Sequence, residues 1–165
     1  MIIGKSNIKL VLKETPVKYS LARRIFNSAV SFEGAATLTE HPIPKSPRQY
    51  WWPIQPTIVN FILALELYLK CLLTIKGKEF RKNHQLSEFF KALDGRSQKH
   101  IAAQLRYQDI SLFLTKVTEI DRALIEWRYI YEYDNKQIDI EFLKAFCRIT
   151  KAYIVENHAS EINEA

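Results

Sequence analysis

The sequence contains little cysteine and little glycine, and each shortage excludes a class of protein. Its two cysteines, Cys71 and Cys147, lie among apolar neighbours without a Cys-x-x-Cys spacing, which excludes a disulfide-rich scaffold and a cysteine-based zinc cluster. Four glycines are few for the many turns of an all-β sandwich. The first residues show no basic segment followed by an apolar one, so we expect no secretory signal and a cytoplasmic location.

Sequence signatures of several enzyme classes are also missing. There is no glycine-rich phosphate loop, no Gly-x-Ser-x-Gly motif and no dinucleotide-binding fingerprint. The histidines are far apart in sequence and have no metal-ligand spacing; they are His41, His84, His100 and His158. We therefore expect no metal and no cofactor.

The remaining composition is typical of one globular domain. Hydrophobic residues make up 47% and charged residues 25% of the 165 positions, which argues against disorder. A chain of this length fits a single domain over residues 1–165. We expect residues 1–14 to form an extended N-terminal arm and residues 158–165 a frayed tail.

The net charge of +6 is unevenly distributed along the chain. Residues 1–60 carry 8 basic and 3 acidic side chains, residues 61–108 carry 9 and 4, and residues 109–165 carry 7 and 11. A basic two-thirds can bind a polyanion such as RNA. Alternatively, the basic and acidic parts neutralise each other within one chain or across a homodimer.

Hydrophobic periodicity predicts an all-α protein, an up-and-down bundle of four long helices with two short helices. The long helices are predicted over residues 16–40, 56–76, 110–133 and 140–157, and the short ones over residues 83–94 and 97–107. Between the first two long helices, residues 41–56 hold five of the six prolines and are predicted to form a loop. We expect the aromatic residues of this loop, Tyr50, Trp51 and Trp52, to pin it onto the core.

The predicted helix over residues 56–76 is apolar on nearly every side. Its middle, from Phe61 to Leu73, is interrupted only by Glu66 and Lys70, and it is too short to span a bilayer. We therefore predict a central core helix and no membrane partner. A buried carboxylate must be paired, so Glu66 needs a cation from another helix.

Arg128 is the cation that the periodicity suggests for Glu66. At 100° per residue it lies at the edge of the apolar stripe of the predicted helix over residues 110–133. Arginine suits a bidentate bond to a carboxylate in a partly dry place. We predict a polar cluster of Glu66, Arg128 and Glu132, which either serves a ligand or only fixes the register of the helices.

Three segments of the chain resemble the HEPN family (higher eukaryotes and prokaryotes nucleotide-binding domain). HEPN domains commonly show a Glu-x-x-x-Lys central helix, a His-x-Leu segment that opens the next helix, and a late helix that bears an arginine. The similar segments here are Asn60–Leu73, Asn83–Phe90 and Glu126–Glu132. The resemblance covers residues 55–155 and implies an all-α bundle, often dimeric, in prokaryotic defence, toxin–antitoxin or stress systems.

The chain departs from the family in its ribonuclease motif. Ribonuclease members carry an arginine followed, after four to six residues, by a histidine on a late helix. None of the nine arginines here has a histidine at that spacing, and Arg96 to His100 is one residue short. Arg128 matches the position of the motif's arginine, but its catalytic role cannot be carried over because cleavage needs a neighbouring proton acceptor.

The first function that fits is binding of RNA or a nucleotide by a HEPN-like domain that lacks the standard nuclease motif and forms a homodimer. A toxin–antitoxin setting would add a nucleotidyltransferase-type antitoxin as a partner. The ligand is expected near the positions that match the family's motifs, with phosphate bound by arginine and lysine and a base stacked on tyrosine. These candidate ligand-binding residues are Arg128, Tyr129, Glu132, Lys70 and Glu66.

Two further functions remain open. The chain could be an active, metal-independent endoribonuclease with a non-standard general base, for which His84 or a tyrosine of residues 129–133 is available beside Arg128. In the absence of catalysis, His84 is a capping or packing residue. The third possibility is a non-catalytic protein-interaction module.

Overall fold

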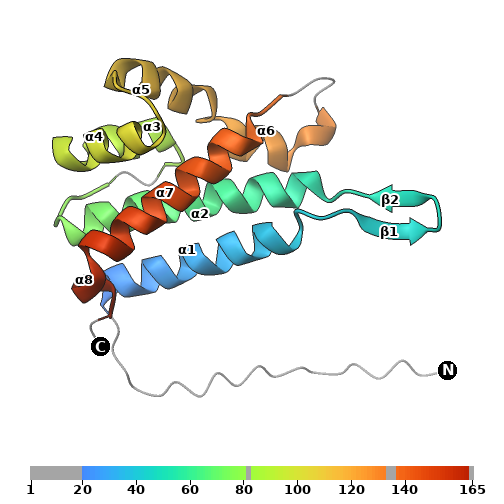
Figure 1. Ribbon diagram of the computed structural model, residues 1–165, viewed down its shortest axis with the longest axis horizontal. Coiled ribbons are helices and arrows are strands. Elements are labelled where there is room, and N and C mark those ends of the chain that lie inside the picture. The colour runs from blue at the N-terminus through green and yellow to red at the C-terminus, as the bar shows by residue number, and fades with distance from the viewer. Residues whose placement is uncertain (1–19, 81–82, 133–136, 164–165) are drawn as a thin grey trace.

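Three long helices form the body of the protein, and a hairpin extends from one end of it (Figure 1). The computed structural model describes residues 20–80, 83–132 and 137–163. The long helices are α1 (Leu21–Leu38), α2 (Ile54–Ile75) and α7 (Ile140–Asn157). The other elements are β1 (Ile43–Ser46), β2 (Gln49–Trp51), α3 (Leu86–Ala92), α4 (Gly95–Gln104), α5 (Ile110–Glu119), α6 (Ala123–Arg128), the 3₁₀ helix η1 (Ile130–Glu132) and α8 (Ala159–Asn163). The mostly helical content confirms the all-α prediction.

The central helix is α2, as predicted. It contacts α1, α7, α6 and α3, and twelve of its 22 residues are buried. By length and composition α2 could cross a membrane, but 61% of its most apolar window is buried inside the protein. Burial on several sides explains why its sequence is apolar nearly all round.

Local capping signals account for several of the helix ends. Asp109 and Asp139 precede α5 and α7 and accept hydrogen bonds from the first-turn N–H groups, at 2.7 and 2.9 Å. At the end of α2, Gly77 has a φ of +63° and the N–H of Lys78 donates to the Leu73 carbonyl at 2.9 Å. This is the glycine-terminated helix end that the sequence predicts at Gly77.

The helix predicted over residues 110–133 is broken into α5, α6 and η1. In the break between α5 and α6, the Asp121 carboxylate accepts hydrogen bonds from the Ser87 N–H, at 2.8 Å, and from the Ser87 hydroxyl. Helix α3 has no side-chain cap of its own, so Asp121 satisfies one of its free N–H groups. Because Asp121 contacts a residue 34 positions earlier in the sequence, α5 and α6 do not join into one continuous helix. The described residues therefore form three long helices instead of the predicted four.

The proline-rich segment between α1 and α2 forms an antiparallel hairpin, whereas the sequence predicts a loop. Cα partners are Ile43 with Trp51 and Pro44 with Tyr50. The exposed fractions of Tyr50, Trp51 and Trp52 are 68%, 48% and 59%. The prediction that these aromatic residues pin the segment to the core is therefore wrong.

Residues 159–163 form α8, in a segment for which the sequence predicts a frayed tail over residues 158–165. Ile162 of α8 is only 6% exposed. The Ser20 hydroxyl donates to the Glu161 carbonyl at 3.2 Å, which joins α8 to the start of α1. The predicted N-terminal arm, residues 1–14, lies outside the described residues.

A hydrogen-bonded network joins the three long helices. The Tyr68 hydroxyl of α2 and the Lys151 ammonium of α7 both donate to Oε2 of Glu33 on α1, at 2.7 and 2.6 Å. Tyr68 is fully buried; burial and the contact with Glu33 raise the pKa of its phenol well above its usual value. Tyr68 therefore stays protonated and acts as a donor.

We expect Tyr68→Phe to lower the free energy of unfolding by about 1.5–3 kcal/mol, because it removes a hydrogen bond to a charged group. The matched control is Tyr107→Phe, since the Tyr107 ring packs on Phe113 but its hydroxyl has no hydrogen bond to a described residue. The control should change stability by less than about 0.5 kcal/mol. Urea denaturation followed by circular dichroism measures both, and equal effects would contradict the role of Glu33.

Candidate functional site

The Glu66 carboxylate lies inside the protein with both oxygens paired. Its side chain is 5% exposed; Oε1 accepts from the Lys70 ammonium at 2.6 Å and Oε2 pairs with Nδ1 of His84 at 2.9 Å. The buried carboxylate is paired, but the prediction that its cation comes from another helix is wrong. The cation is Lys70, one helical turn away, and the second partner comes from the segment before α3.

Arg128 does not pair with Glu66, which corrects the predicted cluster. It ends α6, where its backbone carbonyl accepts a hydrogen bond from the Gln55 side chain at 3.2 Å. Gln55 lies eleven residues before Glu66 on α2, or ~16 Å along the helix axis. Neither Glu66 nor Glu132 forms an ion pair with Arg128 in the described part of the chain. The stripe used for the prediction assumed a continuous helix, and the break at Asp121 removes that geometry.

The contact with Glu66 fixes the orientation and the tautomer of His84. A carboxylate can only accept, so Nδ1 carries the proton in this hydrogen bond. Neutral His84 then keeps its free electron pair on Nε2. The side chain is 53% exposed, and Nε2 has no hydrogen-bond partner among the described residues. A buried carboxylate that orients an accessible imidazole is a suitable arrangement for a general base.

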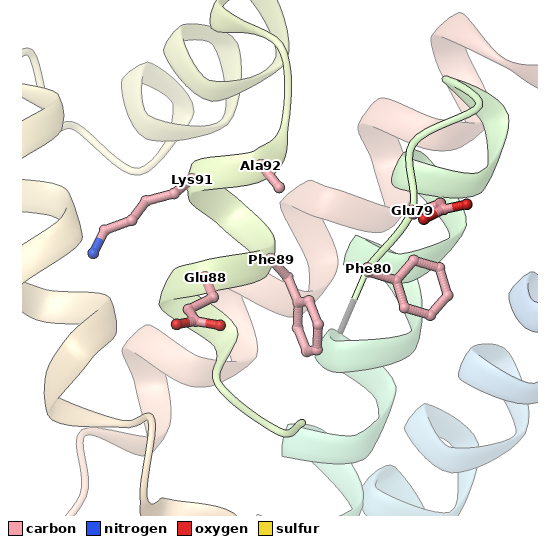
Figure 2. Close-up of a pocket in the computed structure, with 6 residues that line it drawn as sticks. All are labelled: Glu79, Phe80, Glu88, Phe89, Lys91 and Ala92. Carbon is pink, nitrogen blue, oxygen red and sulfur yellow. The ribbon is translucent and has the colours of Figure 1, made fainter. Parts of the chain in front are cut away.

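A pocket of about 450 Å³ adjoins this cluster (Figure 2). Its lining residues are Glu79, Phe80, Glu88, Phe89, Lys91 and Ala92. The Lys70 ammonium lies 5.4 and 4.9 Å from the ring centroids of Phe80 and Phe89, which places Glu66 and its partners next to the pocket. The described lining holds two carboxylates and one lysine, a charge balance that does not favour a phosphate.

A second pocket, of about 470 Å³, lies at the N-terminal end of α2. Its lining residues are Gln55, Pro56, Val59, Arg128 and Tyr129, and none of them is acidic. The Arg128 guanidinium carbon is 5.8 Å from the centroid of the Tyr129 ring. Tyr129 is 41% exposed, so an open cation and an accessible ring face are side by side.

The candidate residues thus form two groups. Glu66 contacts both Lys70 and His84 beside α3, whereas Arg128 and Tyr129 lie at the N-terminal end of α2. Glu132 is exposed in η1, three residues after Tyr129. The expectation that one ligand is bound near Arg128 with His84 and Lys70 close by is therefore replaced by two separate sites.

The cysteines are not candidates for chemistry. Burial raises the pKa of the Cys71 thiol to about 12, and burial, assisted by the Glu33 charge, also raises the pKa of Cys147. Both thiols stay protonated at neutral pH and are poor nucleophiles. Within residues 20–80, 83–132 and 137–163, no group of three or more His, Cys, Asp or Glu side chains is arranged to hold a metal ion.

Sequence reasoning missed the pairing of Glu66 with His84, although a signal was present. Both residues belong to the motif segments on which the family resemblance rests, the Glu-x-x-x-Lys helix and the His-x-Leu segment. Comparisons with protein-family models, with curated proteins and with solved structures find no match to this chain.

We expect Glu66→Gln to lower the free energy of unfolding by about 3–5 kcal/mol, because it leaves the partly buried Lys70 ammonium without its counter-charge. Arg128→Ala should change it by less than about 0.5 kcal/mol, since the exposed guanidinium forms no ion pair with a described residue. Urea denaturation at pH 7 compares the two variants. A large loss in Arg128→Ala would show that the arginine has a buried partner after all.

Proposed function

We propose that this chain is a HEPN-like helical domain that binds RNA or a nucleotide in the cytoplasm, within a prokaryotic defence, toxin–antitoxin or stress system. The observation that carries the proposal is the Arg128–Tyr129 pocket, where an exposed cation lies next to an accessible ring. The motif segments and the helical fold support the family. In this proposal the broken α5–α6 segment takes the place of the fourth long helix of an up-and-down bundle.

The charge around Arg128 favours an anionic ligand. Glu66 is occupied by Lys70 and His84, so it does not neutralise the guanidinium. The pocket also lies at the first turn of the 22-residue helix α2. The Ile54 N–H donates to the Trp52 carbonyl at 2.8 Å and Pro56 has no N–H, so Gln55 carries the free donor of this turn. The positive end of a helix dipole adds to the attraction for phosphate.

Chemically, the pocket suits one nucleotide unit of a chain. Arginine can donate two parallel hydrogen bonds to a phosphate, and the ring of Tyr129 offers a face on which a base can stack. Tyr131 is 77% exposed, with its ring centroid 6.3 Å from that of Tyr129, and it extends the aromatic surface. We infer that phosphate contact dominates the affinity and that binding weakens as salt rises.

The partners follow from the charge distribution and from the family. A homodimer would let the basic part of one chain meet the acidic part of another. A nucleotidyltransferase-type antitoxin is the partner that a toxin–antitoxin system of this kind would supply. Sedimentation at tens of micromolar tests the homodimer, which a purely monomeric protein would contradict.

We expect Arg128→Ala to weaken binding of single-stranded RNA about tenfold at low salt, the loss of one charge-assisted hydrogen bond. The slope of log affinity against log salt should fall by about 0.7, one phosphate contact fewer. Arg128→Lys keeps the charge but not the bidentate geometry, so its affinity for RNA should lie between that of the parent and that of Arg128→Ala. Fluorescence anisotropy of a labelled oligonucleotide measures these values.

The matched control is Lys99→Ala, because Lys99 is an exposed cation of α4 with no ion pair to a described residue. Lys151 would be a poor control since it pairs with Glu33. Lys99→Ala should bind like the parent. If the Arg128 variants also bind like the parent, or if the parent does not bind RNA, the protein-interaction function replaces this proposal.

A second candidate function is favoured by the hydrogen bond between Glu66 and His84. In a metal-independent endoribonuclease, Nε2 of His84 would take the proton of a 2′-hydroxyl, whose oxygen then attacks the adjacent phosphorus to form a 2′,3′-cyclic phosphate. The bond to the 5′-oxygen breaks, and this oxygen takes a proton from water and leaves as a hydroxyl. Glu66 would hold the imidazole and stabilise its cationic form. The acidic lining of the neighbouring pocket argues against tight phosphate binding there, so this candidate ranks second.

If the chain is a ribonuclease, His84→Ala should lower the cleavage rate of total RNA in the presence of EDTA by about 10²–10⁴-fold, the usual contribution of a general base. Glu66→Gln should lower it as well. His100→Ala is the control, because His100 packs on Tyr153 away from Glu66. Absence of cleavage by the parent, or cleavage unchanged in His84→Ala, would exclude this candidate.

A further inference from the structure

The hairpin between α1 and α2 exposes aromatic side chains on both of its faces. Residues 43–52 are called the aromatic arm here; every residue of β1 and β2 is exposed. Successive residues of a strand point to opposite faces. Trp51 therefore shares one face with its partner Ile43, and Tyr50 shares the other with Pro44. Figure 1 shows the two strands extending beyond the helices.

The rings of the arm are available for contact. Tyr50, Trp51 and Trp52 form no ring–ring contact with another described aromatic residue, unlike Phe90 and Phe113 of the core, whose centroids are 4.8 Å apart. The Trp52 indole N–H donates to the Glu40 carbonyl at 3.0 Å, which fixes the base of the arm. Three accessible rings on a short ribbon are a surface suited to a ligand that itself has flat faces.

The charge of the arm is positive. Lys45 and Arg48 are exposed and residues 41–53 contain no acidic side chain. The nearest carboxylate in sequence, Glu40, pairs with Lys144 of α7, so it does not offset the two cations. A basic ribbon with exposed rings matches the chemistry of a nucleic-acid strand, a polyanion with stackable bases.

The β1 edge of the arm is protected against pairing with another strand. Pro44 removes a backbone donor within β1, and Pro42 and Pro47 flank this strand. Proline and exposed cations are the devices by which proteins prevent edge-to-edge pairing. Contacts through side chains are therefore favoured over addition of a protein strand, including one from a second copy.

The arm is continuous with the Arg128 pocket. Trp52 precedes Gln55 by three residues, and Gln55 lines that pocket and donates to the Arg128 carbonyl. A strand bound in the pocket can thus continue directly onto the arm. The two surfaces together offer three cations and several exposed rings at one end of the molecule.

We propose that the aromatic arm binds single-stranded RNA, stacking bases on its three rings and contacting phosphates with its two cations. This inference rests on the proposed function, because the arm extends the RNA path from the Arg128 pocket. A base pair in a duplex already stacks on its neighbours and cannot offer its faces to the rings. The arm should therefore prefer a single strand.

The test replaces Trp51 and Tyr50, which lie on opposite faces of the arm, by an apolar side chain and, separately, by another ring. The probe is a fluorescein-labelled oligouridylate of twelve nucleotides, compared with the same strand annealed to oligoadenylate. Trp51→Leu and Tyr50→Leu should each weaken binding of the single strand about 5- to 100-fold, the range for one lost stack. Trp51→Phe and Tyr50→Phe should stay within about threefold of the parent, because a ring face remains.

Charge gives an independent readout. The double variant Lys45→Gln, Arg48→Gln should lower the slope of log affinity against log salt by about 1.4, two phosphate contacts on a single strand. Leu112→Ala is the apolar control, since Leu112 of α5 is 63% exposed and lies outside the arm. Far-ultraviolet circular dichroism and urea denaturation establish that each variant keeps the helical fold.

The outcomes separate this inference from the proposed function. If the parent binds RNA and Arg128→Ala weakens it while the Leu variants bind like the parent, the arm is not an RNA surface and the proposed function stands. If the Phe variants lose as much as the Leu variants, stacking is overturned. If the Leu variants change only the sedimentation of the protein, the arm is a surface between copies. If the parent binds no RNA, both proposals fail.

Discussion

The burial of α2 on several sides is the constraint on which the rest of the structure depends. A 22-residue helix that contacts α1, α3, α6 and α7 has little surface left for solvent. Any charged side chain on its inner turns must find partners inside the protein. Glu66 takes one partner from its own helix, Lys70, and a second from the segment before α3, His84. The position of His84 is therefore a consequence of packing the core, whatever its chemistry.

The same requirement explains where the remaining elements lie. Partly buried polar groups act between segments far apart in sequence: Asp121 on the first turn of α3, and Glu33 between Tyr68 and Lys151. Hydrophobic periodicity decides which segments become helices, and these polar contacts decide how the helices meet. Each of these contacts satisfies a buried donor or acceptor that would destabilise the fold if it were unpaired.

The sequence predicts those parts of the fold that depend on contacts between residues close together in the chain. The starts of α5 and α7 and the end of α2 depend on neighbours a few residues away, so Asp109, Asp139 and Gly77 revealed them. The break at Asp121 depends on the contact with Ser87, and the sequence around Asp121 does not predict it. The predicted contact between Arg128 and Glu66 depends on the same error. It follows from the angular position of Arg128 on one continuous helix, and the break changes the direction of the chain before Arg128.

The hairpin escaped prediction for a different reason. The prolines of residues 41–56 predict a loop, but a two-stranded ribbon has only edge strands, where proline is tolerated. The size of Trp51 and Trp52 predicts that they pack on the core, because large aromatic side chains are usually buried. Their exposure of 48% and 59% is thus the feature of the structure that local rules explain least.

The surroundings of His84 and of Arg128 differ in charge. Beside α3, the described cations include Lys70, which pairs with Glu66, and Lys91, which lines the neighbouring pocket together with Glu79 and Glu88. At the other end, Arg128, the positive end of the α2 dipole and the two cations of the hairpin meet no carboxylate in the pocket lining. Electrostatic attraction for a polyanion is strongest where like charges are gathered and uncompensated. Under the proposed function a polyanion would bind at the Arg128 end, and only a strand long enough to reach past α6 would bring a phosphate to His84.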